Sequence, residues 1–126
     1  MRCGAVFLAA MLLSGCGKPE SFVPDDKMLA DVAVYEKAIA ETEIIGELLH
    51  SVSVGKQAHE VVVSVRMAWL DKPKQARLLL AQSLQGAWSK IHSPDAPAEA
   101  LIVVIDEVGN RLGGSETNGT DVRVNE

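Results

Sequence analysis

Two segments rich in β-branched residues flank a helical pattern, and this order constrains the fold more than any other feature of the sequence. From His59 to Trp69 apolar and polar residues alternate, and period two is typical of a half-buried strand. From Ala100 to Ile105 every residue is apolar, as in a strand covered on both faces. The segment between them, Asp71 to His92, carries apolar residues at helical spacing. The sequence therefore predicts a strand, a crossover helix and a second strand, with a right-handed crossover if the strands are parallel neighbours.

One alternative stays open for the first strand. Val61, Val65, Ala68 and Trp69 also share one helical face, so residues 57–70 are compatible with a helix.

Further elements are expected before and after this unit. Residues Asp26 to Leu49 show the clearest helical periodicity, with Asp25 and Asp26 as caps. A turn around Gly109 leads into a weak strand, Arg111 to Glu116. Residues 121–124 are either a last edge strand or a frayed tail.

These elements follow one another as helix, strand, helix, strand, strand. The simplest arrangement that buries every apolar stripe is an α+β two-layer sandwich, with two helices packed on one face of a small three-stranded sheet. Within the crossover helix, Leu80, Leu84 and Trp88 are expected to face the sheet, whereas Arg77 and Gln85 are expected to face solvent.

The N-terminus has the organisation of a secretory signal. An apolar run from Ala5 to Leu13 is too short to span a bilayer, which takes about 20 apolar residues. Ser14 and Gly15 follow as small residues, and Cys16 comes directly after them. Residues 13–16 thus resemble the lipobox of bacterial lipoproteins. The resemblance covers only the first sixteen residues.

The resemblance implies cleavage between Gly15 and Cys16 and attachment of lipid to the Cys16 thiol, with acyl chains such as palmitate holding the protein on a membrane. It also implies a location in the bacterial cell envelope, facing the periplasm. Gly17 favours the outer membrane, because lipoproteins kept in the inner membrane commonly carry aspartate there. The expected organisation is a signal peptide over residues 1–15, a lipidated cysteine with a short tether over 16–25, and one small α+β domain over 26–126 with a mobile C-terminal tail.

Charge and cysteine content exclude several classes of function. The chain carries 12 basic and 17 acidic residues, and loss of Arg2 with the signal makes the balance more negative. No basic stripe is present, so nucleic acid is not expected as a partner. Cys3 would leave with the signal and lipid would consume Cys16, so neither a disulfide nor thiol catalysis is expected in the domain.

No catalytic or metal-ligand motif can be recognised. His50, His59 and His92 stand at none of the usual metal-ligand spacings and are interpreted as surface histidines at the ends of elements. His59 and Glu60 could pair a base with a carboxylate, and Asp106 and Glu107 form the best acidic cluster, interpreted as a solvated hairpin rim. We therefore predict no catalytic residue, no metal and no cofactor.

The sequence favours a non-enzymatic accessory or protein-binding component of the cell envelope. Its partners would be the membrane, through the lipid on Cys16, and an envelope protein. Because the segment from Arg111 to Val124 is the weakest and most edge-like, it is the candidate partner contact.

Two alternatives remain. One is a periplasmic small-ligand binder or small hydrolase, which would need His59, Glu60, Asp106 or Glu107 to converge in a pocket. The other is an inhibitor that inserts a loop into an envelope enzyme.

Overall fold

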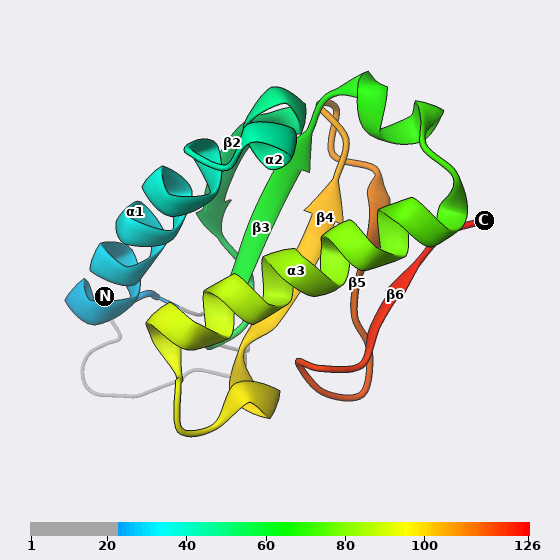
Figure 1. Cartoon of the computed structure of the whole chain (residues 1–126). Coiled ribbons are helices and arrows are strands. Elements are labelled where there is room, and N and C mark those ends of the chain that lie inside the picture. Colours follow the sequence, from blue (N-terminus) through cyan, green and yellow to red (C-terminus); the bar gives the residue numbers. More distant parts are fainter. Residues whose placement is uncertain (1–22) are drawn as a thin grey trace, which may run out of the picture.

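The computed structural model describes residues 23–126, which form three α-helices, two short 3₁₀ helices and one sheet (Figure 1). In chain order the elements are α1 (Asp26–Ala40), α2 (Glu43–Leu48), β2 (Leu49–Val54), β3 (Glu60–Val65), η1 (Met67–Asp71), α3 (Lys74–His92), η2 (Pro97–Glu99), β4 (Leu101–Ile105), β5 (Arg111–Ser115) and β6 (Val122–Val124).

The sheet has five strands in the order β2-β3-β4-β5-β6. Strands β3 and β4 run parallel, with Val61 opposite Ile102 and Val63 opposite Val104. All other neighbours are antiparallel. The long connection between β3 and β4 contains α3, so the strand, helix, strand unit inferred from the sequence forms the centre of the fold.

The predicted fold class, with two helices and a three-stranded sheet, is wrong because the described chain has three helices and a five-stranded mixed sheet. Two segments account for the added strands. Residues Leu49–Val54 form β2, a strand that the predicted arrangement does not contain. Residues Val122–Val124 form β6, with Val122 buried at this edge of the sheet.

The first helix also ends nine residues earlier than its apolar pattern suggests. The buried side chains of α1 are Met28, Val32, Tyr35 and Ile39. If one helix continued through Leu49, the next positions on this face would be Thr42 and Gly46, and Ile44 and Ile45 would lie off it. The chain breaks at Thr42 instead, and α2 restarts with a different face inward. Gly46 permits this close turn, because a Cβ there would lie 2.5 Å from the carbonyl oxygen of Ala40.

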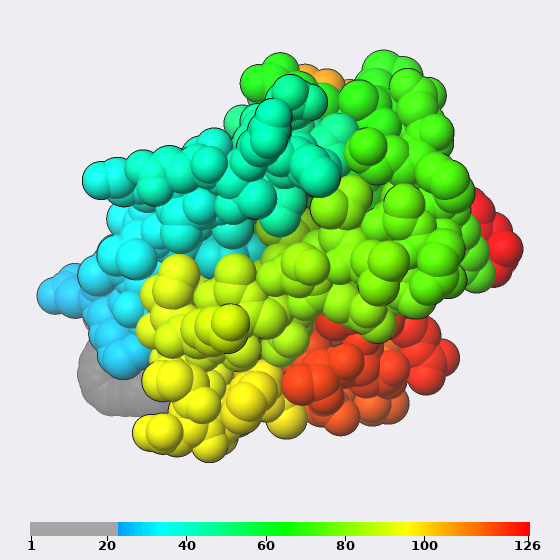
Figure 2. All heavy atoms as spheres, in the orientation of Figure 1, coloured from blue at the N-terminus to red at the C-terminus, as the bar shows by residue number. Residues whose placement is uncertain are grey.

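Helices α1 and α3 lie side by side across one face of the sheet, and in Figure 2 their side chains cover most of it. The core lies between the layers. Trp88 of α3 is fully buried and meets Tyr35 of α1 edge to face, with 5.3 Å between ring centroids. Val61, Val63 and Val65 are buried in this core, as expected from the sequence. The predicted strand to Trp69 is too long, because β3 ends at Val65 and Met67 begins η1, and the strand is not half-buried, because Ser64 is buried as well. The other large, fully buried side chains are Trp69, Leu84, Ile102 and Val104.

Two polar residues of α3 that were expected to face solvent are buried. The Arg77 guanidinium donates to the backbone carbonyls of Lys72 and Asn125. The Gln85 amide donates to the carbonyls of Pro97 and Ala100, each at 3.0 Å. Both side chains donate to backbone carbonyls outside α3, and such a role cannot be read from a helical hydrophobicity pattern.

The opposite face of the sheet carries no described helix (Figure 1). Its central strands present Val62, Leu101, Val103 and Ile105, all only partly buried. Below we call this surface the open face.

Within residues 23–126 no helix is long and apolar enough to cross a membrane. The predictions made for Gly15 and Cys16 lie outside the described residues.

Candidate functional site

Three side chains from three separate segments form one hydrogen-bonded chain at an end of the sheet. Nδ1 of His92 lies 2.8 Å from Oδ2 of Asp31, and Nε2 of His92 lies 2.8 Å from Nδ1 of His59. Asp31 belongs to α1, His92 to the last turn of α3, and His59 to the loop before β3. We call this arrangement the Asp31–His92–His59 relay.

The order of donors along the relay follows from the carboxylate. Burial alone would raise the pKa of Asp31, but hydrogen bonds from Lys27 and His92, together with their charges, outweigh it and hold that pKa below its ordinary value. An ionised carboxylate only accepts hydrogen bonds, so Nδ1 of His92 donates. In a neutral His92 the other nitrogen, Nε2, is then an acceptor, and Nδ1 of His59 donates to it. This leaves a lone pair on Nε2 of His59, which has no hydrogen-bond partner within residues 23–126.

His59 is positioned by its backbone. Its φ is 67°, in the left-handed region where histidine is one of the few enriched side chains. Its carbonyl accepts from the indole Nε1 of Trp88 at 2.9 Å and from the amide of Leu101 at 3.0 Å. Unusual backbone conformations that the surroundings enforce are concentrated at functional sites.

The loop before His59 is held by Glu60. Its carboxylate accepts from the backbone amide of Lys56 at 2.8 Å and from the side-chain amide of Gln57 at 3.3 Å. Gly55 makes room for this carboxylate, since a Cβ there would lie 2.2 Å from Oε1 of Glu60. Glu60 therefore holds the loop in place, and within residues 23–126 its carboxylate forms no hydrogen bond with His59, its partner in the hypothesised base–carboxylate pair.

His92 is held between an aromatic ring and an ion pair. Its ring stacks on Trp88 with 4.6 Å between centroids and an interplanar angle of 2°, and its side chain is only 7% exposed. Lys27 approaches from α1, donating to Oδ2 of Asp31 at 2.7 Å and to the His92 carbonyl at 3.2 Å. The end of α3 is thereby fastened to the start of α1.

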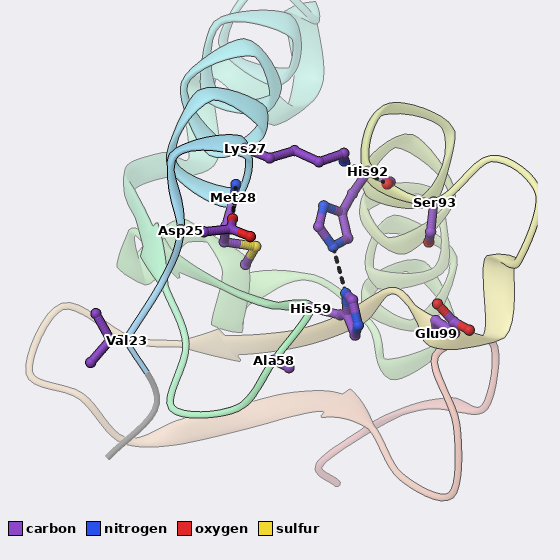
Figure 3. A pocket seen from close by; sticks show the side chains of 9 residues that line it. All are labelled: Val23, Asp25, Lys27, Met28, Ala58, His59, His92, Ser93 and Glu99. Atoms are coloured by element: carbon purple, nitrogen blue, oxygen red, sulfur yellow. Dashed lines mark hydrogen bonds between the residues drawn. The ribbon is translucent and has the colours of Figure 1, made fainter. Parts of the chain in front are cut away.

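The relay opens into a cavity of about 310 Å³ (Figure 3). Met28, Ala58 and Val23 provide apolar lining, and Asp25 and Glu99 provide carboxylates. Figure 3 shows the rings of His59 and His92 facing one another, with Glu99 on the η2 side of His59 and Met28 on the α1 side. The arrangement can therefore accept a hydrogen bond or a proton from a small molecule at His59.

The other sequence candidates lie elsewhere. Asp106 and Glu107 follow β4, at the opposite end of the sheet from the start of β3, so the four residues considered for a hydrolase do not converge. Asp106 organises the turn into β5, and hydrogen bonds from the Asn110 backbone and side chain, then from Val108, lower its pKa. Glu107 lies 3.4 Å from Nδ1 of His50.

The two ends of the candidate partner contact lie in different surroundings. Arg111 is exposed on β5, bonds Glu116 at 3.0 Å, and lines a hollow of about 410 Å³ on the open face. Val124 lies on the edge strand β6 and packs against the core. The floor of the hollow is apolar, formed by Val62, Val103 and Ile105.

Sequence reasoning missed the relay because it treated each histidine alone. One signal could have revealed it. A crossover helix returns antiparallel to the strand before it, so the start of that strand and the end of the helix lie at one end of the sheet. His59 and His92 stand at those two positions.

Comparisons of the chain with protein-family models, with curated proteins and with solved structures gave no match. Over residues 23–126 no group of three or more histidine, cysteine or acidic side chains is arranged to hold a metal ion.

Proposed function

We propose that this protein is a lipid-anchored component of a bacterial cell envelope that binds another envelope protein through the hollow on its open face. The partly exposed apolar floor of that hollow is the observation that carries the proposal. Attachment through Cys16 rests on the lipobox-like residues 13–16 and on the apolar run before them.

The chemistry of the hollow indicates the kind of partner. Val62, Val103 and Ile105 offer an apolar surface that water solvates poorly. Lys56, Arg111 and Glu60 are the charged residues that line the hollow. The Glu60 carboxylate accepts from the Lys56 amide and from Gln57, and Arg111 pairs with Glu116, whereas the Lys56 ammonium forms no ion pair within residues 23–126. A protein segment with apolar side chains and an acidic residue beside them would complement this surface. The contact predicted from the sequence ran from Arg111 to Val124. The contact proposed here includes Arg111, and the central strands take the place of Val124.

The tether supports a location close to the bilayer. Six residues, 17–22, lie between the proposed lipidated cysteine and the described domain. A fully extended chain of this length spans at most about 25 Å. The partner would therefore be a protein with a surface at that height above the membrane.

The anchor is tested by Cys16→Ser. We expect the variant to lose incorporation of radiolabelled palmitate and to leave the membrane fraction, with the precursor uncleaved. Cys3→Ser is the matched control and should be labelled normally. A Cys16→Ser protein that still incorporates palmitate would show that the assignment of Cys16 is wrong.

The binding surface is tested by site-specific photo-crosslinking in cells. A photoreactive residue at Val62 or Val103 should yield one dominant adduct with an envelope protein. The same residue at Leu79, which is 55% exposed on α3, is the control on the helical face. Loss of the adduct when Arg111→Glu reverses the rim charge would support the predicted acidic partner. Equal adducts from Val103 and Leu79, or none from Val62 and Val103, would exclude the open face as the contact.

A further inference from the structure

The relay and its cavity are separate from the proposed protein contact and do not depend on the anchor. We propose that the cavity beside His59 is a binding site for a small organic ammonium ion, whose N–H group donates to Nε2 of His59.

The relay makes Nε2 of His59 a strong acceptor. Each donor in the chain polarises the next, because Nδ1 of His59 donates to His92 and Nδ1 of His92 donates to Asp31. Electron density is thereby pushed toward the nitrogen at the open end. The arrangement is preorganised, since φ of His59 and the stacking of His92 on Trp88 fix both rings.

The charges around the cavity select a cation. Asp25 and Glu99 line it, and Glu99 forms no ion pair within the described residues. Lys27 also lines the cavity, but Asp31 neutralises it at 2.7 Å. When both histidines are neutral, the cavity therefore holds an excess of negative charge and of acceptor groups.

Two further features fit the same ligand. Met28, Ala58 and Val23 provide an apolar wall for a short alkyl group. Ser93 also lines the cavity, and its hydroxyl oxygen is buried without a hydrogen-bond partner in residues 23–126.

The proposed hydrogen bond requires that Nε2 of His59 carry no proton. A proton arriving at Nε2 of His59 lets its Nδ1 proton pass to Nε2 of His92, so the positive charge comes to rest on His92 beside Asp31 and against the face of Trp88. Nε2 of His59 then carries a proton and donates instead of accepting. The charged groups around it are Asp25, Lys27 and Asp31 from the α1 side, His92 from α3 and Glu99 from η2.

The test is a titration followed by nuclear magnetic resonance, using the full-length chain in the form that the cell produces, with ¹⁵N-labelled histidine. At pH 8, n-butylammonium chloride is added in one series, and sodium butyrate of the same shape and opposite charge in the other. We expect a saturable shift of the His59 Nε2 signal with n-butylammonium alone, while His50 stays unchanged.

Variants separate binding from folding. His59→Asn removes the imidazole and keeps a residue that tolerates positive φ, so backbone amide signals of the cavity should no longer respond. Glu99→Gln should weaken binding several-fold, and Asp95→Asn, outside the cavity lining, should leave it unchanged. Binding of butyrate as well as n-butylammonium, no shift with either, or an unchanged response in a folded His59→Asn protein would each overturn the proposal.

Discussion

The indole Nε1 of Trp88 donates a hydrogen bond to the backbone carbonyl of His59, across 2.9 Å. One aromatic side chain therefore fills the core, supports the ring of His92 and fixes the backbone that presents His59. The site and the core share this residue, so the relay cannot be rearranged without a change in packing.

The first prediction concerns this hydrogen bond. Trp88→Phe should destabilise the protein more than Trp69→Phe, by about 1 kcal/mol, because Nε1 of Trp69 is buried without a partner in residues 23–126. Both substitutions remove the same volume from a buried position, so their difference reports the hydrogen bond together with the loss of indole stacking on His92. Urea unfolding of the two variants measures it. Equal losses would mean that the Trp88 bond contributes nothing net.

Asp31 should stabilise the fold in a pH-dependent way. Its pKa in the folded state lies below the ordinary value of 3.8, so its contribution is fully present above pH 3.8 and is lost as the pH falls through the folded-state pKa. Asp31→Asn should cost about 1.5–3 kcal/mol at pH 7, because hydrogen bonds to a charged group are lost. Denaturant unfolding at pH 7 and pH 2.5 should show that cost shrinking in acid.

A neighbouring carboxylate provides the control for Asp31. Asp26→Asn, in the exposed first turn of α1, should change stability by only a few tenths of a kcal/mol through the helix dipole. An Asp31→Asn cost that is the same at both pH values would contradict the ion-pair interpretation.

Two helical glycines should respond in opposite directions to the same change. Gly86→Ala in α3 should stabilise the protein by about 0.5–1 kcal/mol, since nothing lies within 4 Å of the new methyl group. Gly46→Ala should destabilise it, because the methyl carbon would lie 2.5 Å from the Ala40 carbonyl oxygen. Thermal unfolding of the two variants decides this, and a stabilised Gly46→Ala protein would contradict the packing of α2 against α1.

The C-terminal strand should be structurally required. Val122→Asp would bury an unpaired charge and should cost about 3 kcal/mol or more. Its neighbour Arg123 is exposed and pairs with Asp121 at 3.2 Å, so Arg123→Asp should cost about 1 kcal/mol or less. Urea unfolding and limited proteolysis compare them. Similar stability in both variants would indicate that residues 121–124 are a frayed tail, which is the alternative considered from the sequence.

Patterns of apolar residues along the sequence predicted the two central strands. The alternation of Val61, Val63 and Val65 identified the buried face of β3, and the apolar run near Ile102 identified β4. Strand β2 and the break at Thr42 were missed because a helical spacing can be read through Leu49 when each position is judged only as apolar or polar.

The crossover places His59 and His92 at one end of the sheet, but it does not predict the hydrogen bonds of the relay. Its hydrogen bonds join residues 33 and 61 positions apart, and its geometry requires a positive φ at His59 that no neighbouring glycine or proline indicates. Arg77 and Gln85 illustrate the same limit, since their carbonyl partners come from segments placed by the tertiary fold.

The contact between the imidazoles of His59 and His92 can be used to follow folding. It forms only when α1, the loop before β3 and the end of α3 have all reached their final positions. Parallel pairing of β3 and β4 requires closure of a long loop, which is slow compared with the formation of a helix. Partly assembled chains that already contain α3 would have two solvated, independent imidazoles. The imidazole signals of His59 and His92 would therefore distinguish the folded protein from such partly assembled chains. Helical content alone would not distinguish them, because α3 is present in both.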